Sequence, residues 1–445
     1  MKQVTCGDLE VIEMLKAIIE NSIESRKMKY CYSYKIDSGW LVLNGITQVL
    51  LFMDENEYND FFESDFAKET FFSVPLDIDE MSVVKEIRKS INKSLYQERK
   101  APTKYTIFTT TACNARCSYC FEKGIEFVSM NDEIAKQVSQ YIVERCDGIN
   151  EDINIHWFGG EPLLNSNIID KICSDLEKAN LQFHSTMTSN GLLIDQYSKE
   201  VLLNKWKLNQ IQITLDGTRE IYNATKKYVV HEDDAYEHVI QNIKMLLDLG
   251  IAVEIRLNIS TTNGENLLKL IDELYQEIGN HDCLSVYCCS LLERDDNNVY
   301  RRTEEDNKLL EAYEIKIQKR MFELGFFKER LRPILWTRRC SAERESEITI
   351  MPDGSLGICA LYYSENRIGH INNPEINRLI VDSFKEHFDD LEECFNCDLY
   401  PQCLRIKKCK FDTDWCPKEN RDMARQEMFQ QMQYEYQCFM KEYGE

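Results

Sequence analysis

Three cysteines in one short loop are the residues of this chain best suited to redox chemistry. Cys113, Cys117 and Cys120 are separated by three and two residues and directly follow Tyr105–Thr109, an apolar run that predicts a strand. Three thiolates so close together can bind three of the four irons of a [4Fe–4S] cluster, which leaves the fourth iron open to another ligand. An electron from such a cluster can break a carbon–sulfur bond of a bound sulfonium and leave a carbon radical. Zinc is the alternative, although zinc sites usually take four ligands from two separated pairs.

Further polar motifs stand where the following strands are predicted to end. Gly159-Gly160-Glu161-Pro162 has two glycines that let the backbone approach a ligand, and its carbonyls could accept hydrogen bonds from an ammonium; an ordinary glycine turn is the alternative. Thr188-Ser189-Asn190-Gly191 and Gln212-Ile213-Thr214-Leu215-Asp216-Gly217 end the next two strands. On the fifth strand Arg256 and Asn258 alternate with apolar residues, so both face one side, and we expect the inner side. A structural salt bridge is the alternative role for Arg256.

The order of the predicted elements explains how these motifs would meet. From Tyr105 to about Leu324, six short apolar runs alternate with longer amphipathic ones, a pattern typical of strand–helix units. Six such units with right-handed crossovers predict an α/β fold, a parallel sheet with helices on one side that curls into a partial (β/α)6 barrel. Catalytic groups in such folds lie at the carboxyl ends of the strands. The predicted strands are Tyr105–Thr109, Asp152–Phe158, Phe183–Thr188, Gln210–Leu215, Ala252–Ile259 and Leu284–Ser290, and the predicted helices are Met130–Cys146, Ile168–Asn180, Ile194–Asn204, Ala235–Leu249, Glu265–Ile278 and Glu304–Leu324.

Two different regions flank the barrel, so we expect three domains: residues 1–100, 101–325 and 326–445. The first is a small α+β unit with a helix over Asp8–Arg26, strands at Lys29–Ile36, Trp40–Leu43 and Val49–Phe52, and helices near Glu55–Glu63 and Asp79–Tyr96. After Arg338 the chain is rich in cysteine. A hairpin is predicted there from Ile348–Met351 and Ser355–Ile358, with Pro352-Asp353-Gly354 as its turn. Such a region is organised by metal rather than by a large apolar core.

Composition limits the class of protein. The net charge of -23 argues against nucleic acid as a partner, because phosphate binding needs a basic surface. We find no apolar stretch of about 18 residues and no basic-then-apolar start, so we expect neither a membrane partner nor a signal peptide, and a cytoplasmic protein follows. In that reducing compartment the 18 cysteines would bind metal or iron–sulfur centres, or pack as small apolar residues, rather than form disulfides.

The cysteine loop, with the aromatic Tyr119 before its last cysteine, closely resembles that of the radical S-adenosylmethionine (SAM) superfamily. The resemblance extends to the motifs at the strand ends and implies SAM as a cofactor and an oxidoreductase activity. In relatives the glycine motif contacts the SAM amino group. By the same resemblance, Ser189 at the third strand end would meet the SAM carboxylate. Lys226 stands where relatives place an arginine, and it could neutralise a carboxylate only as a point charge. The residues expected around SAM are Gly159, Gly160, Glu161, Pro162, Ser189, Asn190, Gln212, Thr214, Lys226, Arg256 and Asn258.

The cysteines beyond the barrel resemble those of the SPASM domain, which carries two auxiliary [4Fe–4S] clusters, for three clusters in all. By this resemblance Cys394, Cys397, Cys403 and Cys416 would hold the outer cluster, and Cys340, Cys359 and Cys409 the inner one. Five residues separate Cys403 from Cys409, where the family usually has three. The inner cluster has no evident fourth ligand: an open iron could bind a substrate thiolate, or Cys288 or Cys289 could supply the ligand. Zinc remains the alternative for the paired cysteines.

Radical SAM enzymes with this C-terminal domain mostly modify peptides. The resemblance therefore implies a maturase that crosslinks a ribosomally made precursor peptide, with a cysteine thioether as the expected bond. A carbon–carbon crosslink and a formylglycine-generating, sulfatase-maturase-like activity are the alternatives. Cys359 is followed by Ala360 rather than by the aspartate base of the sulfatase branch, and 112 residues precede Cys113, which favours peptide crosslinking. Residues 1–100 weakly resemble the winged-helix domain that binds a leader peptide, with a structural cap on the barrel as the alternative. A flavodoxin or ferredoxin is expected as the electron donor.

Overall fold

In the structure, a computed structural model, the described residues form two compact units. Unit 1 takes its described residues from 1–98, 328–340 and 386–445, and unit 2 takes them from 99–327 and 341–385. The division into three domains remains a prediction, because residues beyond 326 are shared between these two units. The described residues are 1–19, 24–97, 102–120, 122–146, 152–229, 234–291, 303–328, 331, 342, 347–360, 367–373, 375–384, 396–402 and 418–444.

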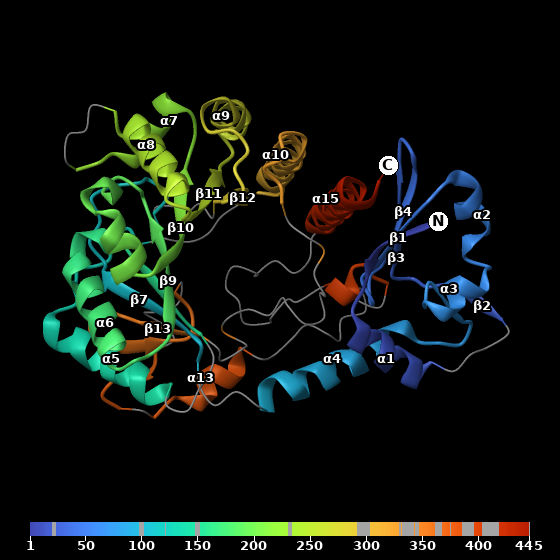
Figure 1. Ribbon diagram of the computed structural model, residues 1–445, viewed down its shortest axis with the longest axis horizontal. Helices are drawn as coiled ribbons and strands as arrows, with labels where there is room; N and C mark the ends of the chain where they lie inside the picture. Colours follow the sequence, from blue (N-terminus) through green and yellow to red (C-terminus); the bar gives the residue numbers. More distant parts are fainter. Residues whose placement is uncertain are drawn as a thin grey trace. The chain divides into compact units, whose positions relative to one another are not determined.

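Unit 2 is built on a nine-stranded sheet in the order β12-β11-β10-β9-β8-β7-β13-β14-β15 (Figure 1). Its first six strands pair in chain order and run parallel, which confirms the predicted α/β fold with a parallel sheet. How far this sheet curls toward the six-unit partial barrel remains a prediction. The six strands are β7 (Lys104–Thr110), β8 (Ile153–Gly159), β9 (Phe183–Ser189), β10 (Leu208–Leu215), β11 (Ala252–Ile259) and β12 (Leu284–Ser290).

The alternation of side chains along these strands separates two faces of the sheet. In β9, for example, Phe183, Ser185 and Met187 are buried, whereas Thr186 and Thr188 are half-buried. Because successive side chains of a strand point to opposite faces, one face is covered by the helices and the other carries polar groups. The helices are α5 (Asp132–Arg145), α6 (Ser166–Lys178), α7 (Arg219–Lys226), α8 (Ala235–Asp248), α9 (Gly264–Glu277) and α10 (Glu304–Glu323), with the 3-10 turns η1 (Pro162–Asn165) and η2 (Ile194–Gln196).

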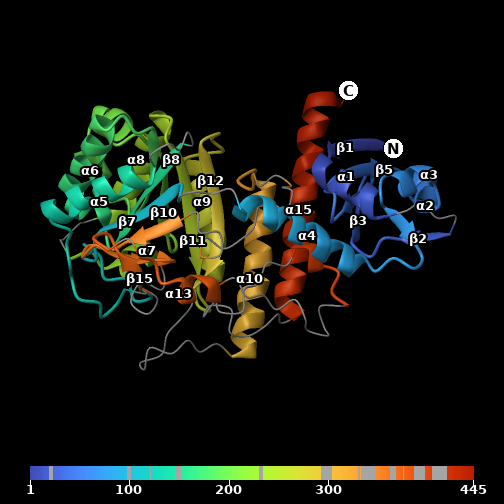
Figure 2. The same cartoon turned by 90° about the horizontal axis from the view of Figure 1, so that it is seen from below.

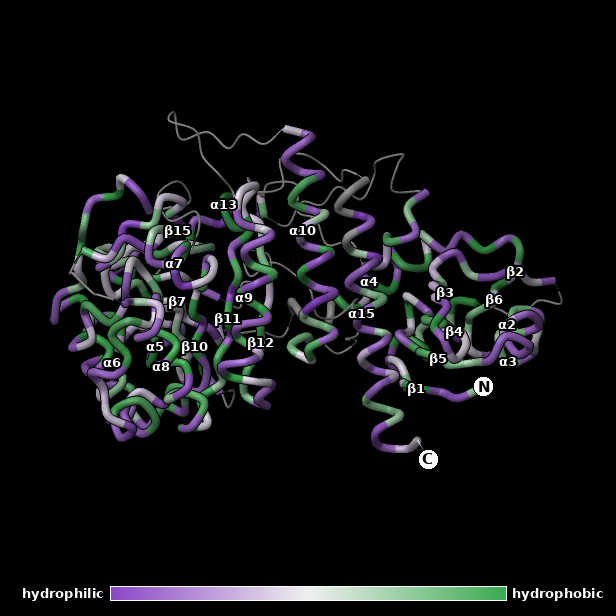
Figure 3. The backbone as a smooth tube through the Cα atoms, turned by 90° about the horizontal axis from the view of Figure 1, so that it is seen from above, coloured by the Kyte–Doolittle hydropathy of each residue, from purple (hydrophilic) through white to green (hydrophobic). Residues whose placement is uncertain are grey.

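The helices are amphipathic and have defined starts. Asn131 caps α5 by accepting from the Ile134 N–H, and Thr303 and Asp306 form a capping box at the start of α10. Figure 1 shows α5 and α6 side by side, and α6 packs against β7. Figure 3 shows hydrophobic and hydrophilic turns succeeding each other along α10. None of the helices described combines the length and the apolar character that crossing a bilayer requires.

One predicted helix has a different form. Ile194–Asn204 was expected to be α-helical, but the structure has the turn η2 and then a π-helix, η3 (Glu200–Lys205). The wider turn ends with the Trp206 N–H bonded to the Val201 carbonyl at 2.9 Å. Trp206 is fully buried, and its indole Nε1 donates to Asp170 Oδ1 at 2.6 Å. Burial of this large side chain therefore favours the wider turn over a regular helix.

Three strands from the C-terminal part of the sequence extend the same sheet. The hairpin expected at residues 348–358 is confirmed, and β13 pairs parallel with β7, with Glu347 opposite Lys104 and Ile350 opposite Ile107. The sequence had indicated no attachment to the barrel. The bounds are β13 (Glu347–Ile350), β14 (Ser355–Gly357), β15 (Arg367–His370) and the helix α13 (Arg378–Ser383). Figure 2 labels β15 and α13.

Unit 1 contains an antiparallel sheet in the order β1-β5-β4-β3 and a two-stranded sheet of β2 and β6. The first helix is shorter than predicted, because Ser25–Lys27 forms β2, and β1 was not predicted. The strands are β1 (Lys2–Cys6), β2 (Ser25–Lys27), β3 (Cys31–Ile36), β4 (Gly39–Asn44), β5 (Val49–Met53) and β6 (Ser73–Pro75). The helices are α1 (Leu9–Ile18), α2 (Glu55–Phe61), α3 (Asp65–Glu69), α4 (Glu80–Gln97), α15 (Lys418–Tyr443) and the turn η5 (Tyr400–Gln402).

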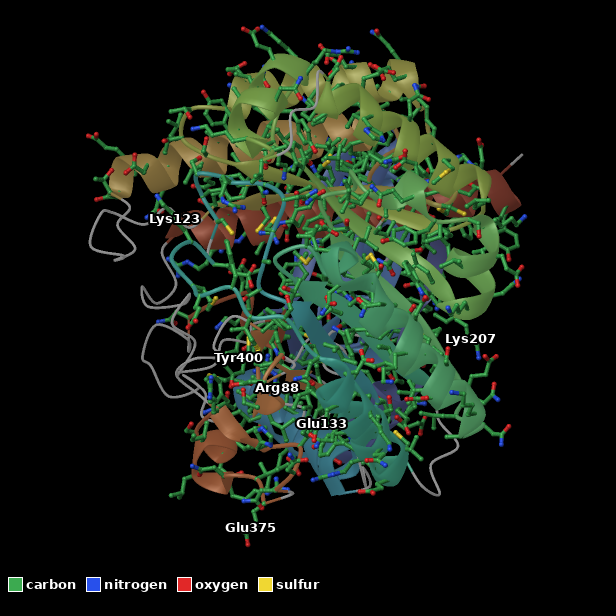
Figure 4. The ribbon with its side chains drawn as sticks, turned by 90° about the vertical axis from the view of Figure 1, so that its left-hand side faces the viewer. Arg88, Lys123, Glu133, Lys207, Glu375 and Tyr400 are labelled. Atoms are coloured by element: carbon green, nitrogen blue, oxygen red, sulfur yellow. The ribbon has the colours of Figure 1, made fainter. Side chains whose placement is uncertain are left out.

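Both faces of the four-stranded sheet of unit 1 are covered. Residues of α1 and α4 join Val42, Leu51 and Phe72 in one core, whereas α15 lies on the other face. There Phe429 stacks on Tyr34 and Tyr436 on Phe52, with ring centroids 4.6 and 4.7 Å apart. Arg88 of α4 donates from Nη2 to the Tyr400 carbonyl at 2.7 Å, and these two residues lie next to each other in Figure 4. The C-terminal helix is therefore an integral part of the N-terminal unit.

Candidate active site

The cysteine loop follows β7 and is anchored by backbone hydrogen bonds to the end of α7. The Arg116 N–H donates to the carbonyls of Lys226 and Lys227 at 2.9 and 3.1 Å, and the Val229 N–H donates to the Asn114 carbonyl at 2.7 Å. Lys227 accommodates this junction with a left-handed backbone, φ +49°. The loop is therefore attached to a segment more than a hundred residues further along the chain.

All three thiols of the loop are half-buried. Burial raises the pKa of the Cys113 thiol to about 12 and that of Cys120 to about 11, and it raises the pKa of Cys117 as well. The Cys113 Sγ accepts a hydrogen bond from the Ala115 N–H at 3.4 Å. Without a bound cation these thiols would stay protonated, and a metal centre would deprotonate and hold them.

The thiols suit an iron–sulfur cluster better than a single metal ion. Among the described residues, no three side chains of Cys, His, Asp or Glu gather around one point as the ligands of a single ion would. The thiolates that hold a cubane cluster bind three different irons, so they do not converge on one point. A half-buried, all-sulfur donor set on one loop fits that arrangement, and Cys113, Cys117 and Cys120 would hold the cluster.

The two glycines at the end of β8 allow close contact with the start of the cysteine loop. A Cβ on Gly159, which has φ +126°, would lie 2.1 Å from the Thr110 carbonyl oxygen, and one on Gly160 would lie 2.3 Å from that of Ala112. The Gly160 and Glu161 N–H groups donate to these same carbonyls at 3.1 and 2.9 Å. The glycines therefore serve the packing of β8 against the loop, in addition to any contact with a ligand.

Glu161 of this motif is fully buried and holds the end of β9. Its carboxylate accepts from Ser189 Oγ at 3.0 and 3.1 Å, from the Asn190 N–H at 2.8 Å and from the Leu163 N–H at 3.2 Å. Burial raises the pKa of Glu161 to about 7. The hydrogen bonds favour the charged form and lower the pKa, but the effect of burial is larger. Ser189, expected at the SAM carboxylate, donates to Glu161 instead; its contact with SAM remains a prediction.

A buried polar network lies behind the cysteine loop. Lys226 Nζ is 3.0 Å from Asp216 Oδ2, 2.5 Å from Thr214 Oγ1 and 3.1 Å from the Tyr119 hydroxyl. Tyr119 donates to Asp216, with 2.8 Å to each carboxylate oxygen, and Asn258 Nδ2 donates to Asp216 Oδ1 at 2.9 Å. Burial alone would lower the pKa of Lys226, but the Asp216 carboxylate raises it well above its usual value. The ammonium of Lys226, which was expected to neutralise the SAM carboxylate, is thus already paired with the carboxylate of Asp216.

Two side chains of β11 each have a buried polar atom that could bind a ligand. Arg256 Nε and Asn258 Oδ1 are buried and have no hydrogen-bond partner among the described residues. Arg256 also donates from Nη2 to Cys289 Sγ at 3.4 Å, and Tyr287 donates to Gln212 Oε1 at 2.8 Å on the neighbouring strands. Buried polar atoms are rarely left without partners, so a donor and an acceptor on one strand fit a polar cofactor such as SAM.

His156 and His184 are further functional candidates, missed at the sequence level. They belong to one chain of hydrogen bonds. Its successive members are Thr188 and His156 (3.3 Å), His156 and Thr186 (2.8 Å), Thr186 and Asn154 (3.3 Å), Asn154 and His184 (2.7 Å), and His184 and Asp152. Burial lowers the pKa of His156 to about 3, so its ring is neutral. Asn154 and His156 alternate with apolar residues in β8, as Arg256 and Asn258 do in β11, and that signal could have identified them.

Most of the cysteines expected to bind auxiliary clusters lie outside the described residues. These are Cys340, Cys394, Cys403, Cys409 and Cys416. Cys359, just after β14 in unit 2, and Cys397, just before η5 in unit 1, are described, and both are half-buried. Cys288 and Cys289, the possible extra ligands, end β12 and are also half-buried. The auxiliary clusters remain a prediction.

Part of the chain is similar in sequence to curated proteins. A curated relative, the cysteine-type anaerobic sulfatase-maturating enzyme of Clostridium novyi, is 24% identical over 323 residues, which cover 65% of this chain and 83% of that protein. The radical SAM cyclopropyl synthase TigE of Paramaledivibacter caminithermalis is 21% identical over 336 residues, 67% of this chain and 66% of that protein.

A solved structure and a family model are also similar to this chain. A structure of native anSMEcpe with bound AdoMet and Kp18Cys peptide has the same fold, with a TM-score of 0.57 and 15% identity over 76% of this chain and 99% of that one. Residues 107–274, which include the cysteine loop and five of the parallel strands, match the Radical SAM superfamily model. The chain is therefore an enzyme that carries a Radical SAM superfamily domain.

Proposed function

We propose that this enzyme matures a ribosomally made precursor peptide by joining a peptide carbon to a cysteine sulfur of the same peptide. One C–H and one S–H bond break and one C–S bond forms, so the peptide loses two hydrogen atoms. The observation that carries the radical chemistry is the loop of Cys113, Cys117 and Cys120, half-buried at the end of β7 and anchored to Lys226 and Lys227.

The cofactors would bind at the carboxyl ends of the strands. Cys113, Cys117 and Cys120 would hold a [4Fe–4S] cluster, and Arg256 and Asn258 would offer their unpartnered atoms to SAM. When bound, these groups supply a carbon radical by one-electron cleavage of a carbon–sulfur bond of SAM. The remaining residues proposed around SAM are Gly159, Gly160, Glu161, Pro162, Ser189, Asn190, Gln212, Thr214 and Lys226.

The residues of the chain itself organise this site. The Lys226–Asp216 ion pair and Tyr119 form a hydrogen-bonded network behind Cys117. Glu161 connects the ends of β8 and β9. Such prearranged groups hold a substrate carbon near the reacting atom and exclude water, which accounts for much of the catalytic effect of an enzyme site.

A peptide substrate is supported by the names of the compared proteins and by unit 1. The sulfatase-maturating relative acts on a protein, and the anSMEcpe structure contains a peptide. That structure covers only 76% of this chain, so about a quarter of the chain has no counterpart in it. Both faces of the unit 1 sheet are covered, but β1 and β3 are its edge strands, and among the described residues neither pairs on its outer side. An extended leader peptide could add to such an edge through backbone hydrogen bonds.

The C-terminal cysteines would complete the electron path. Cys394, Cys397, Cys403 and Cys416 are proposed for an outer auxiliary cluster, and Cys340, Cys359 and Cys409 for an inner one with Cys288 or Cys289 as a possible fourth ligand. These clusters, in a SPASM domain, would accept the electron released when the crosslink forms. The half-buried thiols of Cys359 and Cys397 support this assignment.

Conversion of a cysteine to formylglycine is the second candidate function, supported by the Clostridium novyi relative. A carbon–carbon crosslink is a variant of the first proposal, supported by the cyclopropyl synthase. Mass spectrometry separates the three. A thioether removes two hydrogens and blocks alkylation of the cysteine, a carbon–carbon bond removes two hydrogens and leaves the thiol free, and formylglycine replaces the thiol with an aldehyde.

The test is anaerobic reconstitution with iron and sulfide, followed by incubation with SAM, dithionite and short cysteine-bearing peptides encoded near this gene. About twelve irons per chain are expected for three clusters. The matching peptide should lose two hydrogens, and its Cys→Ser variant should not. If the protein binds zinc without sulfide, or cleaves no SAM, the radical proposal is wrong. If it cleaves SAM but yields only an aldehyde, the sulfatase-type function replaces the crosslink.

A further inference from the structure

We propose that the outer surface of the cysteine loop is the docking site for an acidic one-electron carrier, a reduced flavodoxin. The surface consists of Arg116, Lys123, Phe127, Lys227 and Val229, and we call it the loop surface. The inference rests on the proposed function, because a site that cleaves SAM reductively needs one electron per cleavage. One electron would leave the reduced flavin of the carrier, and the cluster held by the three thiolates would gain it.

The loop surface is continuous with the backbone that carries the thiols. Arg116 donates from Nη1 to the Cys113 carbonyl at 2.7 Å, and its guanidinium lies 5.2 Å from the centre of the Phe127 ring. The Lys123 N–H donates to the Cys120 carbonyl at 3.1 Å. Lys123 is labelled at the outer edge of this loop in Figure 4. A partner bound here would therefore contact residues that are hydrogen-bonded to the backbone carbonyls of two of the three cysteines.

The charge of the loop surface is opposite to that of the whole chain. Acidic residues exceed basic ones by 76 to 53 overall. In contrast, residues 111–120, 122–129 and 226–229 expose the cations Arg116, Lys123 and Lys227 and a single carboxylate, Glu126. The net charge of -23 would repel an acidic carrier from most of the protein, so a local cationic area decides where such a carrier can bind.

Exposed apolar side chains lie among these cations. Phe127 is 58% exposed, Val128 40% and Val229 59%, although large apolar side chains are usually buried. In the same segment Val128 is fixed by hydrogen bonds with Thr111, since the Thr111 N–H donates to its carbonyl at 2.9 Å and its own N–H donates to Thr111 Oγ1 at 2.8 Å. A few apolar contacts ringed by charges are typical of the small, short-lived interfaces of electron-transfer partners.

The test compares two reductants in the same reconstituted enzyme. The variant is Lys123→Glu with Phe127→Ser, at two exposed residues of the loop surface, and the matched control is Lys178→Glu on the exposed side of α6. With flavodoxin, flavodoxin reductase and NADPH, formation of 5′-deoxyadenosine should fall about tenfold in the variant and stay unchanged in the control. With dithionite, which is small and needs no docking surface, the variant should match the wild type.

Binding gives a readout independent of turnover. In NMR titrations of 15N-labelled oxidised flavodoxin, the Kd should rise about tenfold for the variant, and this difference should shrink as salt is raised from about 0.05 to 0.5 M. Equal Kd values for the variant and the wild type would overturn the proposal, as would equal losses with both reductants. A wild-type enzyme that cleaves no SAM even with dithionite would refute the proposed function instead, and the titration would still test the surface.

Discussion

Lys226 and Asp216 form an ion pair in which both side chains are only 2% exposed and the Nζ–Oδ2 distance is 3.0 Å. The pair lies directly behind the cysteine loop, since the Lys226 carbonyl accepts from the Arg116 N–H. It therefore connects the stability of the parallel sheet to the geometry of the candidate cluster site.

Removing the charge of Lys226 should destabilise the metal-free protein. In Lys226→Met the Asp216 carboxylate stays buried without its partner, which is expected to cost about 3–5 kcal/mol in the free energy of unfolding. Denaturant unfolding would measure this loss. Lys178→Met, which breaks the exposed pair with Asp175, should cost less than about 1 kcal/mol. The double variant Lys226→Met/Asp216→Asn should recover part of the loss, and no recovery would show that the pair is not the cause.

Glu161 should make stability depend on pH. Its pKa in the folded protein is raised to about 7 from 4.5, so its contribution is fully present below pH 4.5 and is lost as pH rises through 7. Glu161→Gln keeps an acceptor for Ser189 and Asn190 but cannot ionise. As pH rises between these values, the free energy of unfolding of the variant should increase by about 3 kcal/mol relative to that of the wild type. Denaturant unfolding of the metal-free proteins measures this difference. If the free energy of unfolding changed with pH in the same way in both proteins, the carboxyl of Glu161 would not have a raised pKa.

Gly160→Ala should displace the cysteine loop. The added Cβ would lie 2.3 Å from the Ala112 carbonyl oxygen, so backbone must move, at an expected cost of about 1–3 kcal/mol. We expect lower iron and sulfide content after reconstitution. Gly124→Ala is the matched control, because nothing lies within 4 Å of its Cβ, although φ +86° adds strain. Full iron content in Gly160→Ala would show that the loop tolerates the shift.

Replacing the loop cysteines should remove one cluster. Cys113→Ala/Cys117→Ala/Cys120→Ala is expected to lose about four irons per chain and all SAM cleavage, with the irons of the proposed auxiliary clusters retained. Cys6→Ala, at an exposed cysteine of unit 1, should bind as much iron as the wild type. Iron and sulfide analysis checks both. An unchanged iron content in the triple variant would place the cluster elsewhere.

Local patterns predicted the elements of the parallel sheet well. The six parallel strands have their expected positions, because apolar runs between polar turns specify a strand from neighbouring residues alone. Elements whose form depends on distant packing were missed: η3 is widened where Trp206 is buried, and β1 pairs with β5, more than forty residues further along the chain. The attachment of β13 to β7 was also beyond local pattern.

By itself the sequence determined the chemistry available to this protein: three thiols after a strand, glycines at the next strand end and polar residues on alternate positions. The tertiary structure decided which of these groups are already engaged. Lys226 faces Asp216, Ser189 faces Glu161, and Arg256 Nε and Asn258 Oδ1 of β11 are among the buried polar atoms without partners in the described part of the chain. The physical reason is that spacing along a chain fixes which residues can be neighbours on one element. Partners tens of residues apart are fixed by strand register and burial.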